Sequence, residues 1–139
     1  MLEEYRFVQR FRVPFGDVDM MHHVNNVAYI RWAETIRSDY FLEVLGAEIL
    51  SPRGMIMANL TIDYEATLSY RENVAIGCKI DRFGTKSFDF VYEIWSADRR
   101  QRVAKLRSAM VAMDYSVNRS FAVPDEWRRK IEAFEAATP

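Results

Sequence analysis

Hydrophobic residues recur along the chain with two different spacings, and the spacing changes several times between the two ends. In residues 5–13, phenylalanine and valine alternate with arginine, an alternation that is typical of a half-exposed strand. Pro14 and Gly16 then interrupt the pattern, as residues of a turn do. The first element is therefore expected to be a strand that leads into a loop.

Residues 25–45 carry apolar side chains at steps of three and four, which predicts one long helix with a broad apolar stripe. That stripe is formed by Val27, Ile30, Ala33, Ile36, Tyr40, Phe41 and Val44. Charged side chains fall largely between these positions, at Arg31, Glu34, Arg37 and Glu43. Asn25 or Asn26 is expected to cap the start of the helix, and Gly46 stands where helices commonly end. A helix this long and aromatic is expected to lie inside a curved sheet.

Four more stretches alternate with a period of two after Pro52 and Gly54, and each of them predicts a strand. The first three have one apolar face each, formed by Ile56, Ala58, Leu60, Ile62 and Tyr64, by Val74, Ile76, Cys78 and Ile80, and by Phe88, Phe90, Tyr92 and Ile94. The fourth, residues 102–115, has apolar side chains on both sides and is expected to be buried on much of both faces.

A second helix is predicted near the end of the sequence. Pro124 followed by two acidic residues is typical of a helix start, and Trp127, Ile131 and Phe134 continue one apolar stripe. The predicted order of elements is strand, helix, four strands and helix. Antiparallel strands grouped around one long helix indicate the α+β class.

Composition narrows the class of protein further. The chain has 139 residues, which suits one domain covering residues 1–139. Its 19 basic and 20 acidic side chains give a net charge of −1, which provides no electrostatic attraction to nucleic acid or to an anionic membrane. One cysteine, Cys78, cannot form an internal disulfide, which favours a reducing compartment. No apolar run approaches the ~20 residues of a membrane helix, and the first residues lack a signal-peptide profile. A cytoplasmic protein is expected.

Candidate chemistry is concentrated in residues 15–26, directly before the long helix. Both histidines, His22 and His23, and two carboxylates, Asp17 and Asp19, lie within seven residues. The start of a helix offers unpaired backbone N–H groups, which can polarise a carbonyl and stabilise the oxyanion that forms on attack. A nearby carboxylate can orient or deprotonate water, or attack the carbonyl directly.

Structural roles compete with this chemistry for each residue. Asp17 or Asp19 can form an Asx turn or a capping contact, and helix capping is sufficient to explain Asn25 and Asn26. Neighbouring histidines point in different directions, so no shared metal ion is expected, and the chain has no paired-cysteine metal motif. Cys78 alternates with apolar residues and is expected in the core rather than as a nucleophile.

Residues 17–37 contain the pattern Asp17-x-Asp19-x-x-x-His23-Val24-Asn25-Asn26-x-x-Tyr29, followed by Trp32, Glu34 and Arg37. This pattern closely resembles the hot-dog thioesterases, in the branch related to 4-hydroxybenzoyl-CoA thioesterase and to bacterial acyl-CoA thioesterases. The resemblance implies a hot-dog fold, in which an antiparallel sheet wraps around the first long helix, here with an extra C-terminal helix. It also implies a homodimer or homotetramer in which the sheets of two chains join edge to edge.

The resemblance implies a role for each residue of the pattern. Asp19, the second aspartate, is the implied catalytic carboxylate, acting as general base toward water or as nucleophile toward the thioester carbonyl. The backbone amide near Asn26 is the implied donor to the thioester oxygen. His23 is implied to shape the site or to contact the thioester, Tyr29 to bind substrate, and Asp17 to hold the loop.

His22 and Glu34 stand apart from the other residues of this region. Family members usually have glycine directly before His23, whereas this chain has His22, whose side chain can narrow the pocket or supply a further acid or base. This departure concerns the conformation of the loop more than the fold. Glu34 matches the helix glutamate that a different hot-dog branch uses in catalysis, but here it is expected to pair with Arg37 on the helix face.

Residues 82–88 form a basic turn between two predicted strands. In related thioesterases the corresponding turn contacts the CoA nucleotide or pantetheine, which implies substrate binding by Lys86 and Ser87, with Arg82 as a further candidate. A solvated hairpin turn is the competing interpretation.

The function that the resemblance implies is hydrolysis of an acyl-CoA thioester to the free acid and CoA, with no metal or organic cofactor. An acyl-carrier-protein thioester is an alternative substrate. A non-catalytic module that binds acyl thioesters is an alternative of a different class, and the Asp-x-Asp loop argues against a hot-dog hydratase or dehydratase. The methionines and aromatic residues suit either an aliphatic or an aromatic acyl group.

Overall fold

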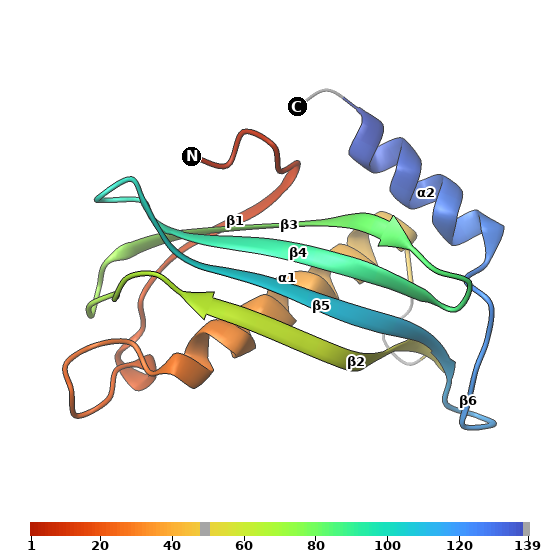
Figure 1. Cartoon of the computed structure of the whole chain (residues 1–139), viewed down its shortest axis with the longest axis horizontal. Helices are drawn as coiled ribbons and strands as arrows, with labels where there is room; N and C mark the ends of the chain where they lie inside the picture. The colour runs from red at the N-terminus through yellow and green to blue at the C-terminus, as the bar shows by residue number, and fades with distance from the viewer. Residues whose placement is uncertain (48–50, 138–139) are drawn as a thin grey trace.

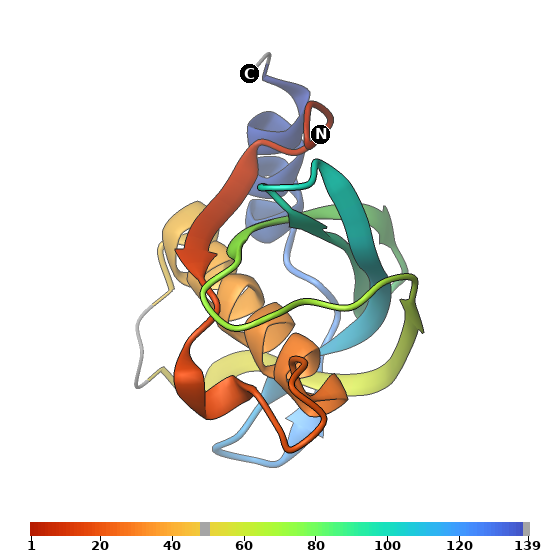
Figure 2. The ribbon, with the colours of Figure 1, turned by 90° about the vertical axis from the view of Figure 1, so that its left-hand side faces the viewer.

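A six-stranded antiparallel sheet curves around one long helix in the computed structural model, which describes residues 1–47 and 51–137 (Figure 1). Across the sheet the strands are β1 (Phe7–Arg12), β3 (Asn73–Phe83), β4 (Ser87–Ser96), β5 (Gln101–Asp114) and β2 (Arg53–Tyr64), with β6 (Arg119–Ser120) beside β5. The helices are α1 (Asn26–Leu45) and α2 (Asp125–Ala136), and a short 3-10 turn, η1 (Phe15–Asp17), precedes α1. Figure 2 shows the strands arching over α1. The predicted α+β class and order of elements are confirmed, and β6 is an addition.

The two ends of α1 are set by the residues that the sequence suggested. Of the two candidate caps, Asn25 is the one used, because its side-chain oxygen accepts from the N–H of Val27 at 2.9 Å. Gly46 ends the helix with a φ of 65°, a left-handed conformation that glycine adopts without steric cost. No helix in the described residues is long and apolar enough to cross a membrane.

The buried face of α1 lies partly beside the predicted stripe. Ala33, Ile36, Tyr40 and Phe41 are buried as predicted, but Val27 is 51% exposed. Residues that are buried outside the predicted stripe are Ala28, Tyr29, Trp32, Arg37 and Leu45. Spacing alone could not orient this helix, because apolar residues occur around most of its circumference.

Arg37 was expected with the exposed charged residues, and this is wrong, because only 5% of the residue is exposed. Its Nη1 donates to the hydroxyl of Tyr92 at 3.2 Å, and Tyr92 shares a 2.6 Å hydrogen bond with Ser108. The predicted pair with Glu34 forms at 3.8 Å, with Glu34 itself largely exposed. Because a buried charge is costly without polar partners, the hydroxyl of Tyr92, itself held by Ser108, supplies the partner from the sheet that this burial requires.

The inner faces of β3 and β4 are those that the sequence predicted. The buried residues on these faces are Val74, Ile76, Cys78 and Ile80 of β3, and Phe88, Phe90, Tyr92 and Ile94 of β4. β5 is buried on its inner side, whereas Lys105 and Arg107 on its outer side are exposed. The expectation that both faces of this strand are largely buried is therefore wrong at these two positions.

β2 departs from its predicted alternation because of a bulge between Met57 and Asn59. Leu60 and Ile62 pair with the buried Ser108 and Leu106, and Met57 and Met55 pair with the buried Met110 and Ala112. Ile56 and Ala58 therefore do not share the inner face with Leu60, which corrects the single predicted face. One extra residue in a strand reverses the facing of every residue before it.

α2 packs at the C-terminal end of α1 and holds the turn between β3 and β4. Its predicted stripe is confirmed, since Ile131 is buried and Trp127 and Phe134 pack against the core. Lys130 Nζ donates to the carbonyl of Leu45 at 3.1 Å. Arg128 donates to the carbonyl of Gly84 in the β3–β4 turn. This turn therefore lies at the end of the molecule where α1 ends (Figure 1).

Tyr92→Phe tests how the charge of Arg37 is accommodated. The substitution leaves the guanidinium buried without its hydrogen bond, so we expect the free energy of unfolding to fall by about 2 kcal/mol. Arg37→Met removes the buried charge itself, and the only charged group that loses its partner is the exposed Glu34. The free energy of unfolding should therefore fall by less in this variant, about 1 kcal/mol or less. Urea unfolding measures both values. A larger loss for Arg37→Met than for Tyr92→Phe would contradict this explanation.

Candidate active site

Residues 17–25 form a narrow hairpin directly before α1, and its backbone brings Asp19 next to His23. The N–H of Asn25 donates to the carbonyl of Asp17 at 2.8 Å, and the N–H of Asp19 donates to the carbonyl of His23 at 3.1 Å. Val18 and Val24 form a β-bridge between these two contacts. The candidate carboxylate and the candidate histidine therefore belong to one small structure at the start of α1.

Asp19 begins the turn at the tip of this hairpin. Its carbonyl accepts from the N–H of His22 at 3.0 Å, and its Oδ1 accepts from the N–H of Met21 at 2.9 Å, which makes an Asx turn. Asp19 therefore has the structural role of an Asx-turn residue. This role occupies one carboxylate oxygen, and Oδ2 has no hydrogen-bond partner among the described residues, on a side chain exposed to solvent.

His22 occupies the position in this turn that favours glycine. Its φ is 66°, in the left-handed region where a side chain costs roughly 1–2 kcal/mol. Three-residue hairpin loops commonly end in such a left-handed residue, most often a glycine. The glycine usual at this position of the family pattern thus has a geometric reason, and His22 adopts the glycine conformation with its side chain in solvent.

In the first turn of α1, one backbone N–H has no partner among the described residues. Asn25 accepts from the N–H of Val27 through its side chain and from the N–H of Ala28 through its carbonyl, both at 2.9 Å. The N–H of Asn26 has no hydrogen-bond partner within the described part of the chain. Because the helix dipole places partial positive charge at this end, the N–H is suited to stabilise an oxyanion.

Asp17 holds the hairpin onto α1. Its Oδ1 accepts from Arg31 Nη2 at 2.6 Å, and its Oδ2 accepts from Trp32 Nε1 at 2.9 Å. Both carboxylate oxygens are therefore engaged with the helix. Of the two aspartates in the pattern, Asp19 is the one with an oxygen left for chemistry.

Tyr29 belongs to the first turn of α1, and its side chain lies in the core. Its ring packs against Trp32 and edge-on against Tyr64, each with centroids 5.3 Å apart, and burial raises the pKa of its hydroxyl to about 12. Contact of Tyr29 with substrate stays a prediction. Tyr64 donates to the carbonyl of Asn26 at 2.6 Å and ties the end of β2 to the first turn of α1. Nothing in the sequence signals this contact, because it joins residues 38 apart.

Apolar side chains are exposed around the hairpin. Met20 and Met21 at its tip are 93% and 76% exposed. Phe15 is also exposed, with its ring edge-on to that of Tyr70 at 5.7 Å. Exposed apolar side chains that form one contiguous patch commonly mark a place where a ligand or another chain binds.

The residues predicted to bind CoA lie at the opposite end of the molecule. Lys86 lies in the β3–β4 turn, with Arg82 near the end of β3 and Ser87 at the start of β4, at the end of the molecule where α1 ends, whereas Asp19 lies where α1 begins (Figure 1). The 20 residues of α1 span about 30 Å, so one chain does not bring the two sets together. Within the described residues, Arg82 and Lys86 form no ion pair and stay available to an anion.

Neither a cysteine nucleophile nor a metal cluster is present among the described residues. Cys78 is fully buried, and burial raises the pKa of its thiol well above the ordinary value, which confirms its place in the core. Residues 1–47 and 51–137 contain no group of three or more His, Cys, Asp or Glu side chains that could hold a metal ion.

Comparison with known families identifies the chain. The family model of the thioesterase-like superfamily matches residues 13–131, which include the hairpin, α1 and every long strand after β1. This chain belongs to the thioesterase-like superfamily. The family that the sequence pattern suggested is therefore confirmed for this superfamily member. A search among curated protein sequences finds no match to it.

Solved structures similar to this superfamily member confirm the hot-dog fold. The PA5185 protein from Pseudomonas aeruginosa strain PAO1 is 24% identical, with a TM-score of 0.86 over 99% of this chain and 96% of that one. A thioesterase from Thermus thermophilus, solved with coenzyme A and zinc, is 22% identical, with a TM-score of 0.85 over 98% of both chains. Slr0204, a 1,4-dihydroxy-2-naphthoyl-CoA thioesterase from Synechocystis, is 16% identical, with a TM-score of 0.79 over 90% of this chain and 94% of that one.

His22→Gly tests the strain at the tip of the hairpin. Glycine adopts the left-handed conformation freely, so we expect the free energy of unfolding to rise by about 0.5–1 kcal/mol, after allowance for the greater freedom of glycine in the unfolded chain. Met21→Gly, at a neighbour without positive φ, has only the second effect and should lower it. Thermal unfolding compares the two variants, and equal losses would show that His22 is not strained.

Proposed function

We propose that this protein hydrolyses an acyl-CoA thioester to the free acid and CoA, at a site formed by Asp19, His23 and the N–H of Asn26. The observation that carries the proposal is the unpartnered N–H of Asn26, within the described residues, beside a hairpin that holds a free carboxylate oxygen. Together they offer a donor for an oxyanion and a base for water. Membership of the thioesterase-like superfamily supports the thioester as substrate.

In the proposed reaction, Asp19 takes a proton from water, and the water oxygen attacks the carbonyl carbon of the thioester. The carbonyl electrons move to the oxygen, where the N–H of Asn26 stabilises the negative charge. The tetrahedral intermediate then collapses and the C–S bond breaks. CoA leaves as a thiolate, which takes up the proton from Asp19 and so restores the carboxylate, and the free acid remains. His23 contacts the thioester or shapes the site.

A second route uses the same groups with Asp19 as nucleophile. Its carboxylate attacks the carbonyl carbon, the thiolate leaves, and an acid anhydride joins the acyl group to Asp19. Water then cleaves the anhydride and restores the carboxylate. Incorporation of ¹⁸O from labelled water into Asp19 during turnover would indicate this second route.

CoA is the proposed thiol because two structural relatives are, by name, a thioesterase bound to coenzyme A and a naphthoyl-CoA thioesterase. Lys86 and Ser87, with Arg82, are proposed to contact its phosphates or pantetheine. An acyl-carrier-protein thioester remains the alternative substrate. We also propose a cytoplasmic location, in keeping with the single, buried Cys78.

The proposed active unit is a homodimer, or a homotetramer built from such dimers. β2 lies at one edge of the sheet with its outward edge unpaired among the described strands, and it exposes Ile56, Met57 and Tyr64. β1, at the other edge, carries the exposed Arg10 and Arg12, charges that discourage pairing between edges. The β2 edge is therefore the one suited to a second copy.

Antiparallel pairing of two β2 edges reconciles the separated parts of the proposed site. β2 begins at the end of the molecule that carries the β3–β4 turn and finishes beside the start of α1 (Figure 1). A two-fold axis through the middle of β2 therefore brings the beginning of one copy to the finish of the other. The proposed CoA-binding turn of one protomer then lies at the same end as Asp19 of its partner.

Asp19→Asn should abolish hydrolysis while the protein stays folded. Asparagine keeps an oxygen for the Asx turn but can neither accept a proton from water nor attack a thioester, so we expect kcat to fall by at least about 100-fold. A thiol-reactive dye measures CoA release from short, long and aromatic acyl-CoAs. Asp125→Asn, which changes an exposed aspartate at the start of α2, is the matched control and should retain full activity.

Unchanged hydrolysis by Asp19→Asn would remove the assignment of Asp19 as the catalytic carboxylate. Tight acyl-CoA binding by the wild type without thiol release would favour the non-catalytic module.

Mixed dimers test whether each site draws on two chains. A dimer of one Asp19→Asn chain and one Lys86→Glu chain has one site with both substitutions and one site with neither, if Asp19 and Lys86 come from different chains. Its kcat/KM per dimer should then be about half that of the wild type and far above the mean of the two variant homodimers. Differently tagged, co-expressed chains provide the mixed dimer. Activity no higher than that mean, or a monomer by light scattering, would contradict the proposed arrangement.

A further inference from the structure

The hairpin is anchored at both of its ends to one connecting segment, residues 65–72 between β2 and β3. Before the hairpin, the N–H of Val13 donates to the carbonyl of Glu72 at 2.9 Å, and the carbonyl of Val13 accepts from the N–H of Arg71 at 3.2 Å. Near the C-terminal end of the hairpin, the N–H of Val24 donates to the carbonyl of Leu68 at 2.9 Å. The position of this connecting segment therefore sets where the hairpin lies.

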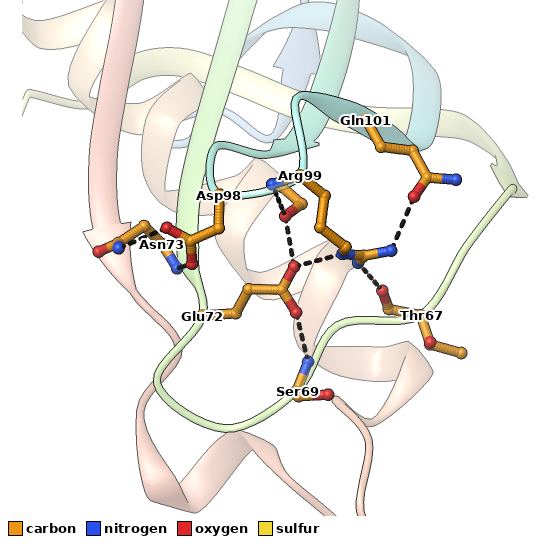
Figure 3. A network of polar contacts seen from close by, with 8 residues as sticks. Thr67, Ser69, Glu72, Asn73, Asp98, Arg99 and Gln101 are labelled. Carbon is orange, nitrogen blue, oxygen red and sulfur yellow. Dashed lines mark hydrogen bonds and ion pairs between the residues drawn. The ribbon is translucent and has the colours of Figure 1, made fainter.

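The residues on either side of Leu68 are held by the two members of one ion pair (Figure 3). Arg99, in the β4–β5 turn, donates through Nη2 to the carbonyl of Thr67. Glu72 accepts from the N–H of Ser69 through Oε1 at 3.0 Å. Arg99 Nε and Glu72 Oε2 join at 2.8 Å and close the ring of contacts. The carbonyl of Leu68 accepts the hydrogen bond from the N–H of Val24. Because Thr67 and Ser69 are both held, this carbonyl is fixed from both sides.

The surroundings of Glu72 favour a permanent charge there. Burial on its own would raise the pKa of Glu72, but hydrogen bonds from the buried hydroxyl of Ser96, from Arg99 and from the N–H of Ser69 hold it below its ordinary value. A second contact lies directly beside the first, since Asp98 accepts from the backbone and the side chain of Asn73, the first residue of β3, both at 2.8 Å. The β4–β5 turn is therefore locked to the connecting segment.

We propose that Arg99 and Glu72 are positioning residues for the active site, acting on the Asp19–His23 hairpin through the carbonyl of Leu68. This inference rests on the proposed function for its effect on catalysis. Neither residue belongs to the hairpin or to α1. Their effect passes through Leu68 to Val24, which stands between His23 and the cap of α1. A displacement of about 1 Å between a base and its oxyanion donor costs on the order of 100-fold in rate.

Arg99→Met tests the proposal, with Arg107→Met as the matched control. Arg107 likewise forms ion pairs, at 2.7 Å with Asp81 and 2.9 Å with Asp89, and its side chain is 45% exposed against 41% for Arg99. It lies on the outer face of the sheet. We expect Arg99→Met to lower kcat roughly 10- to 100-fold with KM within about twofold of the wild type. Arg107→Met should leave both within about twofold, and Arg99→Lys should recover part of the lost kcat.

Hydrogen exchange at the Val24 amide, followed by NMR, gives a readout that needs no catalysis. Exchange should accelerate at least about tenfold in Arg99→Met and stay unchanged in Arg107→Met. Unchanged exchange in Arg99→Met, or an equal loss of kcat in both variants, overturns the positioning role. If the wild type releases no thiol from any acyl-CoA, the proposed function fails, and faster exchange of Val24 still supports the anchoring.

Discussion

A helix starts with backbone N–H groups that no residue inside the helix can accept, and around α1 the disposition of these donors organises the neighbouring structure. Asn25 takes up two of them, and the N–H of Asn26 remains. The hairpin ends directly before these donors, and Asp19 and His23 are paired across its two strands. A donor, a carboxylate and an imidazole are thus collected by one local structure, and each stays close to its sequence neighbours.

This local structure cannot maintain itself. A short two-stranded hairpin is marginal in water, and this one carries a left-handed His22 at its tip with two exposed methionines beside it. Its order comes from outside, because Asp17 is bound by two side chains of α1 and Val24 by the connecting segment. Rigidity at the site is therefore supplied by parts of the chain that carry none of its chemistry.

Periodicity predicted the elements because burial on one side of a helix or strand repeats with the backbone, and the caps Asn25 and Gly46 act locally. The errors depend on distant partners. The bulge in β2 is set by its pairing with β5, and the burial of Arg37 depends on Tyr92, 55 residues further on. In the candidate site, clustering and family resemblance singled out the aspartates and histidines, whereas the contact of Tyr64 with α1 joins positions whose proximity only the folded chain creates.

Charge gives the separated groups a common explanation. A CoA thioester is polyanionic, and a protein with a net charge of −1 does not attract it as a whole, so local cations have to do so. Arg82 and Lys86 are the cations proposed for this role, but about 30 Å of helix separates their end of the molecule from Asp19. In a single protomer, the residues proposed to bind the phosphates and the residues proposed to cleave the thioester lie at opposite ends of the molecule. Under the proposed two-fold pairing the same separation creates two identical sites, because each copy supplies to its partner the end that the partner's own site lacks.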